Sequence, residues 1–367
     1  MEKNNSFDNY QSQIIKGVAI LLMMWHHCFL SGRFEDFNIS FYPLTVEQVT
    51  LIAAFCKICV SLFAFISGYG LFLSFQKWDD SHPGQGCSPW LWIRYVRTFS
   101  GFWLIVLLSW GITGIIDNRP WLVYFRPSRV AGVVYAITDL LGLSNLFGTP
   151  TLCATWWYMS TAFFFIIATP VLYLIINRYG ATLCICIIMI IPRVFIGYPG
   201  GTASLTFLPA FIFGMVFAKE NLFDYINTLI PKTCLACTFC YIICIVSFVI
   251  CFIICKRIPT NKLWDIKWGV FAAIYVLIIF LTISRIPVLR SILAFLGKHS
   301  ANVFMVHTFL RDTYCRSFIY NRGHFLVIMA TLLAMSILVS FLLEGLKRIM
   351  RYDCFTEKLE SHIFPEN

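Results

Sequence analysis

Ten apolar runs, each long enough or nearly long enough to cross a bilayer, restrict the fold of this chain more than any other feature. They cover residues 14–30, 49–75, 99–116, 156–176, 181–198, 204–218, 234–255, 268–284, 292–310 and 325–343. Inside a membrane the backbone must satisfy its own hydrogen bonds, so runs of this length fold as helices. The pattern predicts an all-α, polytopic integral membrane protein with about ten transmembrane helices.

The composition supports this interpretation and limits what else the chain can contain. Hydrophobic residues make up 59% of the 367 positions and charged residues only 13%, whereas a soluble domain is about one quarter charged. Ten spans of about 20 residues use roughly 200 positions. We therefore expect a single transmembrane domain over residues 1–367, with a helical core at about 14–345, short polar tails and no separate soluble catalytic domain.

The net charge of +10 does not indicate nucleic acid, because the 28 Lys and Arg residues are dispersed between apolar runs. Cations in the loops suit the anionic surface of a lipid bilayer better. Placing the N-terminus inside gives a weak excess of cytoplasmic cations, which predicts that both termini are cytoplasmic. The longest connection, residues 117–155, predicts a loop with a surface helix.

Ionisable residues inside apolar runs are costly in lipid and must face a cavity or another helix. Such residues are His26 and His27 in the first run, Lys57 in the second, Arg193 in the fifth, and Lys298 and His299 in the ninth. Lys16 and His27 are eleven residues apart, about 16 Å along a helix. One helix can thus place a cation near the cytoplasmic surface and an imidazole deep in the membrane.

Two other patterns resemble an iron–sulfur site and a potassium-channel filter only superficially. Cys234, Cys237, Cys240 and Cys244 have the spacing of an iron–sulfur run, but no Pro follows them and no second run supplies ligands. In an apolar helix this spacing simply makes a stripe. The Gly68-Tyr69-Gly70 segment lacks the Thr-Val that precedes it in a potassium filter. We expect neither a metal site nor an iron–sulfur cluster.

Five short motifs follow one another in an order that resembles a known family. They are Lys16-Gly17 with His27 at the end of the first run, Phe65-Ile66-Ser67-Gly68, Arg94-Tyr95-Val96-Arg97, Trp156-Trp157-Tyr158, and Leu296-Gly297-Lys298-His299-Ser300 ahead of His307. Their order and spacing resemble membrane acyltransferase family 3, whose bacterial members include O-acetyltransferases of surface saccharides. Two positions depart from the family pattern. Lys16 stands where Arg is usual, and Ala162 stands where many members have an acidic residue.

The resemblance implies an O-acyltransferase that moves an acyl group, most often acetyl, from acyl-CoA (acetyl-CoA) to a hydroxyl of a cell-surface saccharide, an exopolysaccharide or an isoprenoid-linked saccharide. His27 would be the catalytic base, because imidazole titrates near working pH. It could instead carry the acyl group covalently. The enzyme would lie in the cell (inner) membrane and could work with glycan-assembly proteins.

The same resemblance assigns further site residues. Lys16, Arg94 and Arg97 would bind the phosphates of CoA, since Arg94 and Arg97, three apart on a helix, share one face. Cations at the inner end of a span are also what membrane topology requires. The secondary pocket candidates are His26, Ser67, Trp157 and His307. The alternative function is a transporter or flippase of a lipid-linked saccharide, although the chain lacks the internal repeat of many transporters.

Overall fold

A computed structural model describes residues 7–30, 32, 34–126, 128–229, 234–259 and 261–363, with the backbone alone for 234–240, 353 and 360–363. Most of the described chain is helical. Its only β-type pairing is an isolated bridge between Ser40 and His324. The all-α prediction is confirmed for this part of the chain.

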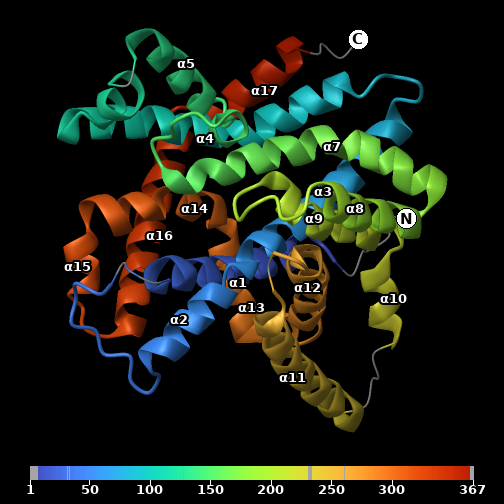
Figure 1. The fold of residues 1–367 in the computed structure, drawn as a ribbon. Helices are drawn as coiled ribbons and strands as arrows, with labels where there is room; N and C mark the ends of the chain where they lie inside the picture. The colour runs from blue at the N-terminus through green and yellow to red at the C-terminus, as the bar shows by residue number, and fades with distance from the viewer. Residues whose placement is uncertain are drawn as a thin grey trace.

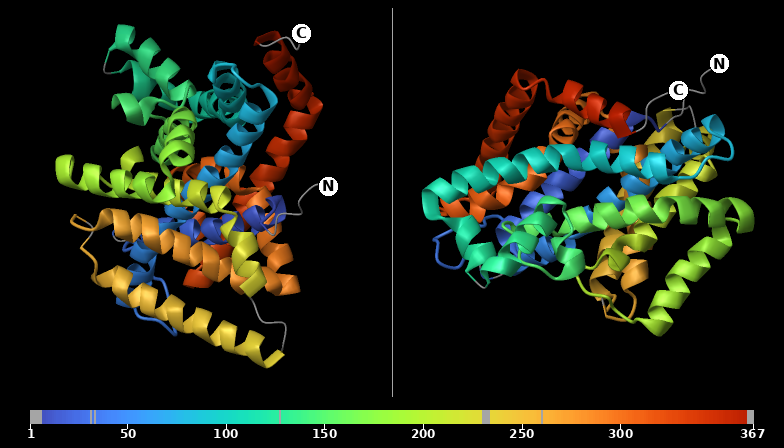
Figure 2. Two further views of the ribbon diagram at one scale, coloured as in Figure 1. Left: turned by 90° about the vertical axis from the view of Figure 1, so that its right-hand side faces the viewer. Right: turned by 90° about the horizontal axis from the view of Figure 1, so that it is seen from above.

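The first half of the chain contains the helices that surround the centre of the molecule. They are α1 (Asn9–Phe29), α2 (Val46–Phe55), α3 (Ile58–Ser81), α4 (Ser88–Asp117), the π-helical turn η1 (Trp121–Phe125), α5 (Arg129–Leu140), α6 (Ser144–Phe147), the short turn η2 (Ala154–Trp156) and α7 (Trp157–Tyr179). Helix α1 runs through the middle of the molecule (Figure 1). Seen from above, the long helices α4 and α7 lie side by side (Figure 2).

The second half completes the bundle. It consists of α8 (Ala181–Phe195), α9 (Ser204–Lys219), α10 (Leu222–Leu229), α11 (Cys234–Arg257), η3 (Ile266–Val270), α12 (Phe271–Leu281), η4 (Ile283–Arg285), α13 (Pro287–Lys298), α14 (Ser300–Thr308), η5 (Phe309–Tyr314), α15 (Arg316–Tyr320), α16 (Phe325–Ile349) and α17 (Tyr352–Ile363). Helix α11 lies alongside α12 at one edge of the molecule (Figure 2).

All ten apolar runs form helix over most of their length, and four of them cross element boundaries. The run 156–176 begins in η2 and continues in α7, and the run 268–284 comprises η3, α12 and η4. The run 49–75 divides into α2 and α3 at Lys57, and the run 292–310 divides into α13, α14 and η5. By length and composition, five described segments can cross a membrane: Val46–Ser81, Ser88–Asp117, Ala154–Tyr179, Ile266–Arg285 and Phe325–Ile349. The bent pair α9 and α10, with 68° between its helices, brings the number to six. Ten spans and cytoplasmic termini stay predictions.

Two pairs of helices approach backbone to backbone because each helix presents a glycine to the backbone of the other. A Cβ at Gly17 of α1 would lie 2.0 Å from the carbonyl oxygen of Leu293 in α13, and a Cβ at Gly297 of α13 would lie 1.9 Å from that of Gln13 in α1. Small residues allow such approaches between membrane helices. Helices α3 and α9 repeat the arrangement. There a Cβ at Gly68 or Gly214 would lie 1.9 or 2.0 Å from a carbonyl oxygen of the other helix.

Two of the ionisable residues that interrupt the apolar runs have partners on other elements, which lowers the cost of their burial. Arg193 of α8 forms an ion pair with the fully buried Asp265. His299, between α13 and α14, hydrogen-bonds through Nδ1 to the Ser340 hydroxyl of α16 at 2.9 Å. These contacts explain how the fifth and ninth runs accommodate ionisable groups.

The connection 117–155 folds over one side of the bundle and contains the predicted surface helix, α5, which leaves the apolar residues Val130, Val133, Val134 and Ile137 exposed. Asp139 near its end is buried. Its carboxylate accepts hydrogen bonds from the Tyr124 and Ser144 hydroxyls and from the Leu152 N–H. Burial raises the pKa of Asp139, and these hydrogen bonds oppose that shift. Asp139 thereby holds the segment 152–155, which enters the site described next.

Candidate active site

A cavity of about 510 Å³ lies among α1, α3, α7 and α14. It is within the size range of small-molecule sites. Five predicted site residues contribute to its wall: Lys16, His26, His27, Ser67 and Trp157. Ala162 also lines it, so the position where many family members carry a carboxylate faces this cavity.

Three imidazoles lie close together: His26 and His27 line the cavity, and His307, which does not line it, lies behind His27. The ring centre of His27 is 5.1 Å from that of His26 and 5.0 Å from that of His307. The Nδ1–H of His26 donates to the Ala53 carbonyl at 2.7 Å, which fixes the ring and leaves the lone pair on Nε2. The two adjacent histidines of α1 thus have distinct surroundings. His26 is fastened to α2, whereas the His27 ring lies against His307.

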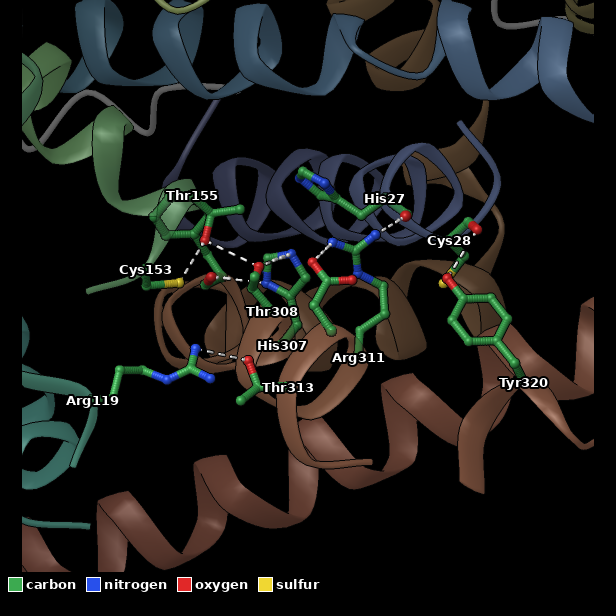
Figure 3. Close-up of polar contacts among 12 residues, drawn as sticks. His27, Cys28, Arg119, Cys153, Thr155, His307, Thr308, Arg311, Thr313 and Tyr320 are labelled. Atoms are coloured by element: carbon green, nitrogen blue, oxygen red, sulfur yellow. Dashed lines mark hydrogen bonds and ion pairs between the residues drawn. The ribbon is translucent and has the colours of Figure 1, made fainter. Parts of the chain in front are cut away.

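His307 is fully buried beside His27, and its hydrogen bonds define its tautomer. Nδ1 lies 2.8 Å from the Phe304 carbonyl, so it carries the proton and donates it. Nε2 then accepts from the Thr308 hydroxyl at 3.3 Å. The chain continues from Thr308 to Thr155 at 3.1 Å and from Thr155 to Cys153 at 3.2 Å (Figure 3).

Arg311 is the site residue that the sequence pattern missed. Its side chain is fully buried, lines the cavity, donates to the carbonyl oxygen of His27 and forms an ion pair with Asp312 (Figure 3). It lies four residues after His307, in the π-helical turn η5, and such wide turns are frequent at functional sites. The four-residue spacing of His307 and Arg311 was a signal in the sequence that could have identified Arg311 as a site residue. However, a cation at the end of an apolar run normally indicates the membrane surface.

Arg94 and Arg97 lie on α4 outside the cavity wall. Arg94 is half-buried, donates to the Ser74 hydroxyl and lies 6.0 Å over the Trp90 ring. Arg97 is exposed, but the next residue, Thr98, does line the cavity. The structure therefore brings Lys16 into the cavity with His27 and leaves the two arginines beside it. Their role toward CoA stays a prediction.

The cavity wall is rich in cations. Lys16, Lys57 and Arg311 line it, together with the single carboxylate of Asp312, which pairs with Arg311. In the part of the chain that the structure describes, no group of three or more His, Cys, Asp or Glu side chains is arranged to hold a metal ion. The side chains of Cys234, Cys237 and Cys240 lie outside that part. The cavity is thus suited to an anionic organic ligand.

Bundled apolar helices around a polar, cationic cavity define the class: a multi-pass membrane protein with an internal ligand site. Residues 9–345 match the family model described as an acyltransferase domain, that of acyltransferase family 3. The chain belongs to this family and is a membrane acyltransferase, which confirms the resemblance of the five motifs. Comparisons with curated proteins and with solved structures give no match.

Proposed function

We propose that this membrane acyltransferase transfers an acetyl group from acetyl-CoA to a hydroxyl of a cell-surface or lipid-linked saccharide, in the cell (inner) membrane. The observation that carries the proposal is that Lys16 and His27, about 16 Å apart along α1, line one cavity. CoA has the same separation of functions, because its pantetheine arm holds the thioester away from the phosphates.

Lys16 is the donor-binding residue in this proposal. Its ammonium group attracts a phosphate as a point charge, without the paired hydrogen bonds that an arginine supplies. Arg94 and Arg97, next along α4 to the cavity residue Thr98, would extend the cationic path toward the phosphates. Trp157 and Ser67 would line the passage for the pantetheine arm between these cations and the histidines.

The chemistry takes place at His27. Its imidazole accepts the proton of the saccharide hydroxyl while the oxygen attacks the thioester carbonyl. The carbon–sulfur bond then breaks, the proton passes from His27 to the departing sulfur, and the products are the O-acetyl ester and CoA thiol. His307 supports the His27 ring by direct contact, and Arg311 holds the His27 backbone.

Substitution of His27 tests this role. We expect His27→Ala to abolish acetyl transfer with little change in the amount of protein in the membrane, because the base is lost while the cavity wall remains. His82→Ala is the matched control, since His82 lies at the end of α3 and stacks on Trp78 instead of lining the cavity. The measurement is the acetyl content of surface glycans by mass spectrometry, in cells with each variant.

Unchanged glycan acetylation with His27→Ala would remove His27 from the mechanism. Trapping after addition of radiolabelled acetyl-CoA separates direct transfer from an acetyl-histidine intermediate: label that stays on the wild-type protein and not on His27→Ala indicates the covalent route. The transporter alternative predicts saccharide flux without acetyl-CoA, and membership of an acyltransferase family favours the enzyme over it.

A further inference from the structure

Lys57 is a cation of the cavity that has no role in the proposed binding of acyl-CoA. It lies at the break between α2 and α3, half-buried, and lines the cavity. Within the described residues, the structure records no hydrogen bond or ion pair for its ammonium group. A charge held in this way inside an apolar bundle is costly unless a ligand compensates it.

The ammonium group of Lys57 is directed to the turn that precedes α9. A Cβ at Gly201 would lie 2.5 Å from its Nζ and 3.4 Å from the Tyr198 hydroxyl, so the absent side chain of Gly201 provides the space for the ammonium. The next residue, Thr202, lines the same cavity. The buried hydroxyl of Tyr158, also in the wall, lies beside the Ser67 side chain, and among the described residues it forms no hydrogen bond of standard geometry. An ammonium group and a phenolic hydroxyl therefore both belong to the cavity wall.

The position of Lys57 distinguishes it from Lys16, the cation proposed to bind the acyl donor. Helices α1 and α3 run in opposite directions, because Phe7 contacts Tyr69 at one end and His26 contacts Ala53 of α2 at the other. Lys57 follows Ala53 by four residues, about 6 Å along a helix. It is thus close to the histidines, whereas Lys16 is about 16 Å from His27. A phosphate of CoA at Lys57 would bring the phosphates, instead of the thioester, to the reacting centre.

Building on the proposed acetyl transfer, we infer that Lys57 and the turn at residues 198–202 form a second anion subsite, which binds a negative charge carried by the saccharide acceptor. The charge is a phosphate or a carboxylate: a phosphate that links the sugar to a lipid, or the acid group of the sugar itself. Tyr158 supplies a hydrogen bond to the same acceptor. This subsite makes an acidic or phosphate-linked saccharide the preferred substrate class.

Direct binding tests this subsite without requiring turnover. The whole protein is placed in nanodiscs of neutral phosphatidylcholine and saturated with CoA, so that the donor site is occupied. Three probes are titrated: octyl glucoside, which is neutral, octyl glucuronide, which carries a carboxylate, and glucose joined to octanol through a phosphodiester. We expect the wild-type protein to bind at least one anionic probe more tightly than the neutral one. The anionic probe that binds more tightly shows whether the subsite prefers a carboxylate or a phosphate.

Lys57→Gln removes the ammonium and should weaken the preferred anionic probe about ten-fold, the scale of one charged hydrogen bond, while leaving octyl glucoside and CoA unchanged. Gly201→Ala keeps Lys57 but displaces its ammonium, so it should weaken the same probe in part. Lys77→Gln is the control, because Lys77 lies exposed on the same helix, outside the cavity.

Equal binding of all three probes by the wild-type protein would overturn the inference, and so would a loss of CoA affinity in Lys57→Gln. A separate assay measures acetyl transfer from acetyl-CoA to the same probes. If Lys57-dependent binding is present and no acetyl is transferred, then the anion subsite stands and the proposed function fails. Transfer to neutral and anionic probes with equal efficiency would keep the function and reject the subsite.

Discussion

Arg311 links His27, the proposed catalytic residue, to the rest of the molecule through two contacts made by the two arms of its guanidinium group. One terminal nitrogen donates to the backbone carbonyl of His27 and the other to the carboxylate of Asp312. A fully buried guanidinium needs such partners, because an uncompensated buried charge costs several kcal/mol. The geometry of His27 therefore depends on a residue 284 positions later in the chain.

Replacing Arg311 with lysine tests this link. Lysine keeps the charge but carries its donors on one nitrogen, which cannot reproduce the positions of the two terminal guanidinium nitrogens, so we expect a loss of about 1.5–3 kcal/mol of stability and a marked fall in acyl transfer. Thermal unfolding in detergent and acetyl transfer to a saccharide probe are the measurements. Arg316→Lys is the control, because the pair of Arg316 with Asp36 is exposed to solvent and contributes at most about 1 kcal/mol. Equal effects of the two substitutions would contradict the special role of Arg311.

At the level of single residues, sequence reasoning found the groups that stand out chemically against an apolar background. His26, His27 and Lys16 were visible because ionisable residues are rare in spans. Arg311 was not, since its burial results from the packing of η5 against α1, and that contact joins segments far apart in the sequence. Lys57 was visible as an interruption of a run, but its exposure to the cavity depends on the turn at Gly201.

Helices α1 and α3 owe their positions to glycines within the same motifs that carry the chemistry. Gly17 follows Lys16, and Gly68 follows Ser67. Each glycine lies against the backbone of a partner helix, while the preceding polar residue lines the cavity. On a helix, adjacent residues point about 100° apart. One residue of each motif can therefore pack against the neighbour while the other faces the ligand.

Alanine at Gly68 should separate α3 from α9, because the added Cβ would lie 1.9 Å from the Phe211 carbonyl oxygen. We expect a loss of about 1–3 kcal/mol, typical of overpacking, measured as a lower unfolding temperature in detergent. Gly70→Ala is the matched control two residues away, where no atom lies within 4 Å of the added Cβ. It should be neutral or slightly stabilising, since Ala is the better helix former. A Gly68→Ala variant as stable as Gly70→Ala would refute the close approach.

The element pattern was predictable where the apolar runs are uninterrupted. Runs 99–116 and 325–343 lie within single helices, α4 and α16. The breaks at Lys57 and His299 were not predicted as helix ends. Periodicity and hydropathy depend on the residue types in a stretch of sequence and do not show where the backbone leaves the helix. His299 is retained inside the bundle by Ser340, a residue 41 positions away. Such long-range partners decide where a run divides.

The orientation of the whole molecule in the membrane is predicted from the distribution of its cations, which gives only a small excess on the side assigned to the cytoplasm. Cys354 offers a direct measurement, because its side chain is exposed in α17, beyond the last candidate span. If the C-terminal segment is cytoplasmic, then a membrane-impermeant maleimide should label Cys354 only after the cells are opened.

The Cys354→Ser variant gives the background from the other cysteines, and the difference between the two proteins reports Cys354 alone. Labelling of Cys354 in intact cells would reverse the predicted orientation. With an even number of spans, such as the predicted ten, it would also place Lys16 at the outer face, where acyl-CoA is absent, and would count against Lys16 as the donor-binding residue.

The two glycine-paired units also determine how the molecule can move. Within α1–α13 and within α3–α9, backbone meets backbone with no side chain between them. Each pair therefore resists sliding and acts as a stiff body. The cavity lies between the pairs, with α1 on one side and α3 on the other. A change of cavity shape that admits a ligand is then expected from movement of one stiff pair relative to the other and not from sliding within either pair.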